Sequence, residues 1–149
     1  YSTAIAIKPD YATAYHNRGI TFSTLGEHTQ AIADFNFAIN LKPDYSDAYN
    51  NRGNAYNGLG NYKQAIEDYD KAIEIKPGFV QAYINRGSAY HNFGNYRQAL
   101  EDYNKAIGIR GLIYLSQGDK NSGCRDARTA CELGNCKLLE VANAKGACS

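Results

Sequence analysis

The sequence lacks the features by which many catalytic, membrane-spanning and nucleic-acid-binding proteins are identified. Its charges nearly cancel, with Lys+Arg 16 against Asp+Glu 15, so there is no clustered positive field of the kind that attracts nucleic acid or an anionic membrane. No apolar run approaches bilayer length, and we expect no membrane span. Walker, H-E-x-x-H, G-x-S-x-G and C-x-x-C motifs are absent. We therefore predict that the protein is not an enzyme and uses no cofactor.

Cysteine is absent from the first 123 residues, and the four cysteines follow at positions 124, 131, 136 and 148. Their spacing, C-x6-C-x4-C-x11-C, lacks the short paired intervals of structural zinc sites, so we expect no bound metal. They are then either small buried hydrophobic residues or partners in disulfides.

What the sequence does contain is a motif that returns every 34 residues. The segment 14–19 (AYHNRG) recurs as 48–53 (AYNNRG) and as 82–87 (AYINRG). A fixed period of this length is typical of stacked helical units whose core is built between neighbours. We therefore expect an elongated all-α array, in which each position of the repeat forms a column of equivalent residues.

Each unit is predicted to hold two helices, A over roughly 12–25, 46–59 and 80–93, and B over roughly 28–41, 62–75 and 96–109. Tyr49, Gly53 and Tyr56 form one stripe of a helix A. Glycine there costs about 1 kcal/mol against alanine, so we expect a neighbouring helix to approach closely. Glycines at 26, 60 and 94 suit the turn between A and B, and Pro43 and Pro77 end the B helices.

Seven columns of equivalent residues stand out when the units are aligned: Tyr15/Tyr49/Tyr83, Gly19/Gly53/Gly87, Phe22/Tyr56/Tyr90, Ala31/Ala65/Ala99, Phe35/Tyr69/Tyr103, Ala38/Ala72/Ala106 and Pro43/Pro77. Together they resemble the tetratricopeptide repeat, in the N-R-G form common in prokaryotic proteins. The resemblance implies a right-handed α-solenoid in which the A helices line a concave face where partners bind.

On this basis we divide the chain into the end of a truncated repeat with its turn (1–11), three repeats (12–45, 46–79 and 80–109), a shortened fourth repeat (110–134), and a capping helix and tail (135–149). The chain then begins in mid-repeat, as a piece of a longer protein. Residues 1–7 would form a helix without its neighbour, through which copies could self-associate.

The period breaks before Arg110. The next glycine of the Gly87 column is expected at 121, yet Arg110-Gly111 comes ten residues early. Arg110 and Asp126 nevertheless keep the 16-residue interval of Arg52 and Asp68, which indicates a fourth repeat. Either residues are missing from the sequence, which we favour because repeat proteins rarely delete a core-forming half-helix, or helix B3 runs straight into 110–117 and invites exchange between chains.

A C-terminal hairpin of helices, about 120–133 and 136–145, indicates how the cysteines would pair. Seven helical residues separate the Cα atoms of Cys124 and Cys131 by about 10 Å, too far for a bridge. A turn at Gly134-Asn135 brings Cys131 near Cys136 and Cys124 near Cys148, and we favour these nested pairs. Disulfides would indicate an extracytoplasmic compartment, and free thiols the cytoplasm.

The helix-A columns that packing does not need are rich in amides and hydroxyls. Asparagine carries both a donor and an acceptor, which matches the peptide group of an extended chain. We predict an asparagine ladder that binds an extended peptide or a partner helix; the alternative is that these side chains only bond neighbouring helices or water. The predicted binding residues are Asn17, Asn51, Asn85, His16, Asn50, Asn54, Gln81 and Ser88.

Chaperone-tail receptors of this family hold a C-terminal carboxylate with lysine and arginine from helix A. The corresponding places here leave no cation to neutralise a carboxylate. We therefore predict a non-catalytic protein-interaction scaffold of another specificity, whose partner is unknown. The alternatives are a structural segment that stacks through its terminal helices, or the recognition arm of a larger enzyme. The places compared are His16, Ile20, Asn51, Gln81 and Asn85.

Overall fold

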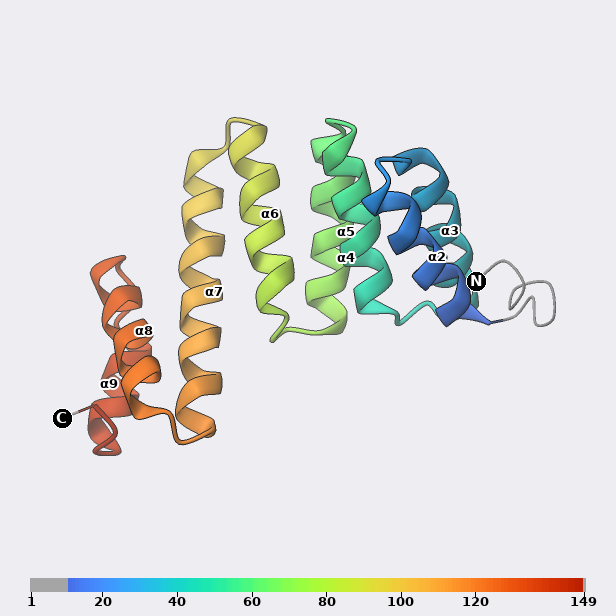
Figure 1. The fold of residues 1–149 in the computed structure, drawn as a ribbon. Helices are drawn as coiled ribbons and strands as arrows, with labels where there is room; N and C mark the ends of the chain where they lie inside the picture. Colours follow the sequence, from blue (N-terminus) through green and yellow to red (C-terminus); the bar gives the residue numbers. More distant parts are fainter. Residues whose placement is uncertain (1–10, 149) are drawn as a thin grey trace.

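The computed structural model describes residues 11–148, which form eight helices and no strand (Figure 1). The all-α solenoid predicted from the repeat is confirmed, while the helix expected at 1–7 lies outside the described residues. In chain order the helices are α2 (Ala12–Thr24), α3 (His28–Leu41), α4 (Ser46–Gly58), α5 (Tyr62–Ile75), α6 (Val80–Asn92), α7 (Tyr96–Ser116), α8 (Lys120–Glu132) and α9 (Lys137–Ala144). Among residues 11–148, no helix combines the length and the apolar character needed to cross a bilayer.

Successive helices pair as hairpins, α2 with α3, α4 with α5, and α6 with α7. Each hairpin turns at a glycine with positive φ, 79° at Gly26, 76° at Gly60 and 88° at Gly94. L-residues with a side chain rarely adopt this left-handed backbone, which explains why glycine recurs at this place. The turns predicted at these glycines are therefore confirmed.

A second glycine column allows the two helices of a hairpin to approach closely. A Cβ added at Gly53 would lie 2.7 Å from the ring of Tyr69, and one at Gly19 would lie equally close to the ring of Phe35. Both rings are almost fully buried. The glycine is therefore retained, despite its low helix propensity, because the ring of the facing helix fills the space of its side chain.

The core lies between hairpins as well as within them. Phe35 and Ala31 of α3 pack against Ala55 of the following hairpin. Tyr69 and Ala65 of α5 pack in the same way against Ala89. Each unit therefore completes its core with its neighbour, as in other repeat proteins.

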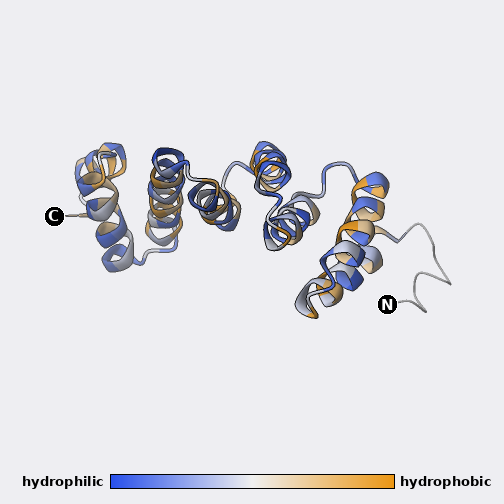
Figure 2. Ribbon diagram, turned by 90° about the horizontal axis from the view of Figure 1, so that it is seen from above, coloured by the Kyte–Doolittle hydropathy of each residue, from blue (hydrophilic) through white to orange (hydrophobic). Residues whose placement is uncertain are grey.

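The A helices form one side of the array. Helices α2, α4 and α6 contact one another in sequence, whereas α3 and α5, both fully described, do not meet. The helices follow one another along a single row when viewed from above (Figure 2). The closer spacing of α2, α4 and α6 makes their side the inner, concave face.

Helix α7 does not end where the repeat predicts. It continues without interruption from Tyr96 to Ser116, so the predicted end at 109 lies inside a 21-residue helix. Residues 104–116 align with 46–58 of α4, so the second half of α7 is the A helix of repeat 4. Helix α8 packs against this half, and Figure 1 shows α8 and α9 displaced from the row of α2 to α6.

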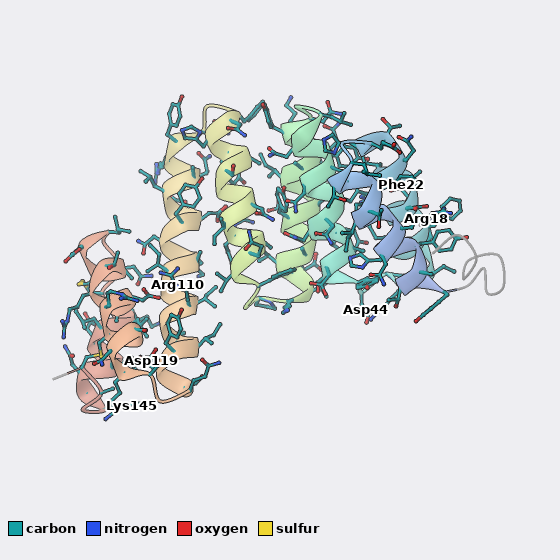
Figure 3. All side chains as sticks on the ribbon, in the orientation of Figure 1. Arg18, Phe22, Asp44, Arg110, Asp119 and Lys145 are labelled. Atoms are coloured by element: carbon teal, nitrogen blue, oxygen red, sulfur yellow. A yellow bond between two sulfur atoms is a disulfide. The ribbon has the colours of Figure 1, made fainter. Side chains whose placement is uncertain are left out.

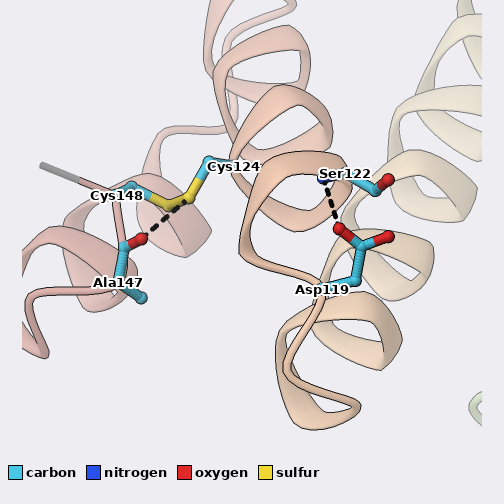
Figure 4. Close-up of a disulfide and its surroundings, with 5 residues drawn as sticks. All are labelled: Asp119, Ser122, Cys124, Ala147 and Cys148. Atoms are coloured by element: carbon cyan, nitrogen blue, oxygen red, sulfur yellow. Dashed lines mark hydrogen bonds between the residues drawn. A yellow bond between two sulfur atoms is a disulfide. The ribbon is translucent and has the colours of Figure 1, made fainter.

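Two disulfides close the C-terminal hairpin. Cys124 is joined to Cys148 and Cys131 to Cys136, with Cα separations of 5.4 and 3.9 Å. Figure 4 shows the first bridge. Both of its cysteines lie in a small core with Ala142. The nested pairing fits this hairpin, and a count of free thiols in the purified protein tests it.

The start of α8 is capped by a side chain in the same region. The carboxylate of Asp119 accepts a hydrogen bond of 3.0 Å from the backbone N–H of Ser122 (Figure 4). This bond lowers the pKa of Asp119. The cap satisfies one of the free N–H groups of the first helical turn and so fixes where α8 begins.

Candidate functional site

A buried histidine connects repeat 1 to repeat 2 beneath the concave face. The Nδ1 atom of His16 lies 3.1 Å from the hydroxyl oxygen of Tyr45, and its Nε2 atom lies 3.0 Å from Nδ2 of Asn51. His16 belongs to α2, Asn51 to α4, and Tyr45 directly precedes α4. The imidazole therefore holds the side chain of Asn51 in a fixed place.

Repeat 2 is connected to repeat 3 by the equivalent residues. Nδ2 of Asn85 donates to Oδ1 of Asn50 at 3.0 Å, just as Asn51 donates to His16 one repeat earlier. Asn50 also donates to Asn51 at 3.4 Å, and Gln81 donates to Asn85 at 2.8 Å. A continuous chain of hydrogen bonds thus runs across α2, α4 and α6.

The protonation of His16 sets the direction of this chain. Burial lowers the pKa of His16, so the ring is neutral at neutral pH and carries one N–H. Because Asn51 donates through Nδ2, the Nε2 atom of His16 accepts and Nδ1–H donates to Tyr45. Burial also raises the pKa of Tyr45, which keeps its hydroxyl protonated.

The eight predicted binding residues lie at different depths. His16 and Asn50 are buried, with 7% and 5% of their surface exposed, so they support the face and do not line it. Asn54 accepts a 2.8 Å hydrogen bond from the hydroxyl of Tyr69 and is itself exposed. Gln81 is also exposed, and the half-buried members of the set are Asn17, Asn51, Asn85 and Ser88.

A groove of about 190 Å³ opens between α2 and α4 beside this chain of hydrogen bonds. Asn51 and Asn54 form one wall, and the buried ring of Phe35 reaches it from α3. The groove also takes in α2 residues that the prediction left out, although Ile20 shares a column with Asn54. The sequence feature that could have indicated this part of the groove is Ile20, an apolar residue in a column whose other members, Asn54 and Ser88, are polar. The added residues are Ile20, Ser23 and Thr24.

The arginines of the A helices are engaged in ion pairs. Arg52 donates through Nε and Nη2 to the two carboxylate oxygens of Asp68, at 2.8 and 2.6 Å. Arg86 pairs with Asp102 in the same way, and this hydrogen bond raises the pKa of Arg86. The carboxylates are buried. Since α2, α4 and α6 contain no lysine, these helices offer no free cation.

The arginines also connect consecutive hairpins. Nη1 of Arg52 donates to Oδ1 of Asn36 in the preceding hairpin, and Nη1 of Arg86 donates to Asp70. Their guanidinium groups lie over aromatic rings of the same helix, Tyr49 for Arg52 and Tyr83 for Arg86. These arginines are therefore structural residues. Within residues 11–148, no group of three or more His, Cys, Asp or Glu side chains is arranged to hold a metal ion.

The hairpins, the glycine contacts and the shared cores define a solenoid of helical hairpins, a class of interaction scaffold. Comparison of the sequence with known protein families identifies the family of solenoid to which the chain belongs. The tetratricopeptide repeat matches residues 46–79 and 80–110, and a second description of the TPR repeat matches 22–60. These matches cover more than half of the chain, which belongs to the tetratricopeptide repeat family. No curated protein matches the sequence.

Solved structures resemble the chain over most of its length. A crystal structure of MamA protein is 35% identical to this chain, with a TM-score of 0.67. The match covers 70% of this chain and 57% of the MamA chain. The TPR2AB domain of yeast Sti1 in complex with pHSP90 is 28% identical to this chain, with a TM-score of 0.69. The match covers 85% of this chain and 46% of the Sti1 chain. The TPR2B domain of yeast Sti1 in complex with pHsp70 is 25% identical to this chain, with a TM-score of 0.67. The match covers 79% of this chain and 97% of the TPR2B chain.

The chain thus spans 57% of the MamA structure and 46% of the TPR2AB structure. The two Sti1 structures are complexes with pHSP90 and with pHsp70. These relatives are therefore protein-interaction modules, as expected of a tetratricopeptide repeat scaffold.

Proposed function

We propose that this chain is a non-catalytic interaction scaffold that binds an extended peptide along the concave face of α2, α4 and α6. The observation that carries the proposal is the chain of hydrogen bonds that orients the amides of Asn51 and Asn85. An amide held in place loses little conformational freedom when it binds a ligand, so more of the contact energy appears as affinity.

Each of these two amides keeps hydrogen-bonding capacity for a ligand. Asn51 and Asn85 each use one N–H of the amide nitrogen toward the preceding repeat, which leaves the other N–H. Both carbonyl oxygens accept one hydrogen bond and have a second lone pair. The two side chains can therefore bond the alternating donors and acceptors of a peptide backbone, while the groove beside Asn51 takes a side chain.

The charges of the face favour a neutral peptide. The arginines of α2, α4 and α6 are already paired with buried aspartates, and these helices contain no lysine. An acidic peptide with a free C-terminal carboxylate would have no cation to pair with. We therefore expect a specificity different from that of the Sti1 domains, whose structures are complexes with pHSP90 and pHsp70.

The test begins with peptides selected from a displayed random library against the immobilised chain. The affinity of a selected peptide is then measured by calorimetry for the chain and for the double variant Asn51→Ala, Asn85→Ala. Loss of two hydrogen bonds of about 1 kcal/mol each predicts a Kd weakened by roughly 30-fold. An acidic peptide with a free C-terminal carboxylate should not compete.

The matched control is Asn40→Ala on the outer helix α3, an exposed asparagine that should leave the Kd unchanged. Circular dichroism of both variants establishes that the helices are retained. An unchanged Kd in the double variant, with the fold intact, would rule out binding through these asparagines.

A further inference from the structure

Helix α7 leaves an apolar face of repeat 3 uncovered. In repeats 1 and 2 the equivalent face is covered by the next A helix, and Ile32 and Ile66 are half-buried there. Leu100 occupies the same column and is 64% exposed, and Tyr96 is 61% exposed. Tyr103 is also less buried than the equivalent Phe35 and Tyr69. The first half of α7 therefore presents a stacking surface that no A helix covers, and Leu133, directly after α8, lies at its border beside Leu100 and Asn104.

A buried polar atom marks the same surface. In the earlier repeats this column holds Asn36 and Asp70, each of which accepts a hydrogen bond from Nη1 of the next arginine. The third member is Asn104, whose Nδ2 atom donates to the backbone carbonyl of Leu133 at 3.0 Å and whose Oδ1 atom is buried without a hydrogen-bond partner in the described part of the chain. A buried acceptor of this kind costs free energy, and its equivalents indicate that an arginine should bond it.

The arginine that should do so lies on the second half of the same helix. Arg110 donates through Nε and Nη2 to Asp126, as its equivalents do within their own repeats. Its Nη1 atom has no acceptor among the described residues, and its side chain is 49% exposed, against 19% for Arg52 and Arg86. Figure 3 labels Arg110 midway along α7.

The apolar side of this second half is exposed as well. Ile113 occupies the column of Ala55 and Ala89, which are fully buried against the preceding hairpin. Ile113 is instead 40% exposed. One straight helix therefore carries both halves of a repeat-to-repeat interface, and because it is straight, the two halves cannot meet within one chain.

We propose that these halves meet between two copies of the chain. Residues 110–116 of one copy dock on the face formed by Tyr96, Leu100, Tyr103 and Ile107 of the other. The hydrogen bond between Asn104 and Leu133 opens on docking, so that Oδ1 of Asn104 in the second copy accepts from Arg110 of the first. A groove of about 280 Å³ between α6 and α7, lined in part by Tyr103 and Ile107, borders this surface. The occupant is a second copy because the missing donor and the missing acceptor lie on the same chain, at positions bonded to each other in the earlier repeats.

Sedimentation equilibrium of the purified chain tests the association. We expect a mass that rises from monomer toward dimer or larger species as the concentration increases. Leu100→Asp and Ile113→Asp should each shift the sample to monomer, since each places a carboxylate in the interface. Both positions are exposed in the single chain, so circular dichroism should be unchanged. Leu59→Asp, at an exposed leucine of the α4–α5 turn, is the matched control and should still associate.

Mixing the two variants tests which surfaces pair. The Leu100→Asp chain keeps an intact second half of α7, and the Ile113→Asp chain keeps an intact first half. An equimolar mixture should therefore form a mixed complex, although neither variant associates alone. A wild-type chain that stays monomeric at all concentrations would overturn the proposal. A mixture that remains monomeric while the wild type associates would overturn it equally, because the contact would then join other surfaces.

Discussion

A single buried imidazole makes the stability of the concave face depend on protonation. The pKa of His16 in the folded chain lies below its ordinary value of 6.5 because burial disfavours the charged ring. The unfolded chain therefore binds the proton more tightly. This contribution to stability is complete above pH 6.5 and is lost as the pH falls through the folded pKa. Protonation also places a hydrogen on Nε2 that opposes the N–H of Asn51.

We predict that His16→Asn removes this dependence. Asparagine is the residue of the same column in repeat 2, where Asn50 accepts the equivalent bond from Asn85. Urea unfolding of the chain and the variant across the acidic range measures the difference in stability between them. This difference should be constant above pH 6.5 and should change in favour of the variant below it. Parallel pH profiles would contradict the prediction.

We predict that Gly53→Ala destabilises the array even though alanine is the better helix former. The added Cβ would lie 2.7 Å from the ring of Tyr69, whose hydroxyl is held by Asn54 and cannot easily give way. Overpacking of about 1–3 kcal/mol should exceed the gain of about 1 kcal/mol in helix propensity. Thermal unfolding measures the result. Gly78→Ala is the control, because nothing lies within 4 Å of its Cβ; equal effects of the two changes would refute the clash.

The sequence predicted the close approach at Gly53, because a costly glycine in a helix needs a compensating contact. It did not predict the hydrogen bonds from His16 to Asn51 and from Asn50 to Asn85. Those bonds depend on how adjacent A helices are rotated against each other, which a residue column does not specify. The alternative that the asparagines bond neighbouring helices therefore describes part of what Asn51 and Asn85 do.

At the scale of elements, the end of α7 is the clearest departure from the repeat. Helix α5 ends at Ile75, just before Lys76-Pro77, and proline disfavours helical geometry in the residue before it. The equivalent position after helix B3 holds Arg110-Gly111 and no proline. Nothing in the local sequence stops the helix there. The helix end predicted at 109 came from the repeat period alone and is wrong for this chain. The observed helix agrees with the alternative in which helix B3 runs straight into 110–117.

We predict that Gly108→Ala stabilises α7 by about 1 kcal/mol, because residue 108 lies inside the helix and an added Cβ meets nothing within 4 Å. Thermal unfolding monitored by circular dichroism measures the gain. Gly111→Ala in the same helix is the control and should bring no gain, since its Cβ would lie 2.9 Å from the side chain of Leu138. No gain at residue 108 would contradict a continuous helix.

At the scale of the whole molecule, the chain consists of three stacked hairpins and a C-terminal unit joined to them by α7 alone. The contacts of α8 and α9 are with α7 and with each other. The fold class followed from the 34-residue period, since repeated helical hairpins allow few other arrangements. The displacement of the C-terminal unit did not follow, because it depends on residues 104–109 serving two repeats at once.

We predict that the bridge between Cys124 and Cys148 stabilises only the C-terminal unit. The bridge spans 24 residues, so its loss in Cys124→Ser, Cys148→Ser should cost about 3 kcal/mol. Hydrogen exchange should accelerate in α8 and α9 and stay unchanged in α2 to α5, because repeat units contact only their neighbours.

Removal of the bridge between Cys131 and Cys136, which spans 5 residues, is the control and should have a smaller effect. The unreduced wild-type chain should show no free thiol. Four reactive thiols would contradict the pairing, and uniform acceleration of exchange along the chain would contradict its local effect.

The uninterrupted course of α7 also makes the direction of the C-terminal unit a matter of residue count. Each residue of an α-helix contributes a rotation of about 100° and a rise of about 1.5 Å. One insertion or deletion within 104–109 would swing α8 and α9 around the helix axis by more than a quarter turn, with little change in their distance from repeat 3. Homologues that differ in length by one residue here would thus present their C-terminal units in different directions, while their concave faces stayed the same.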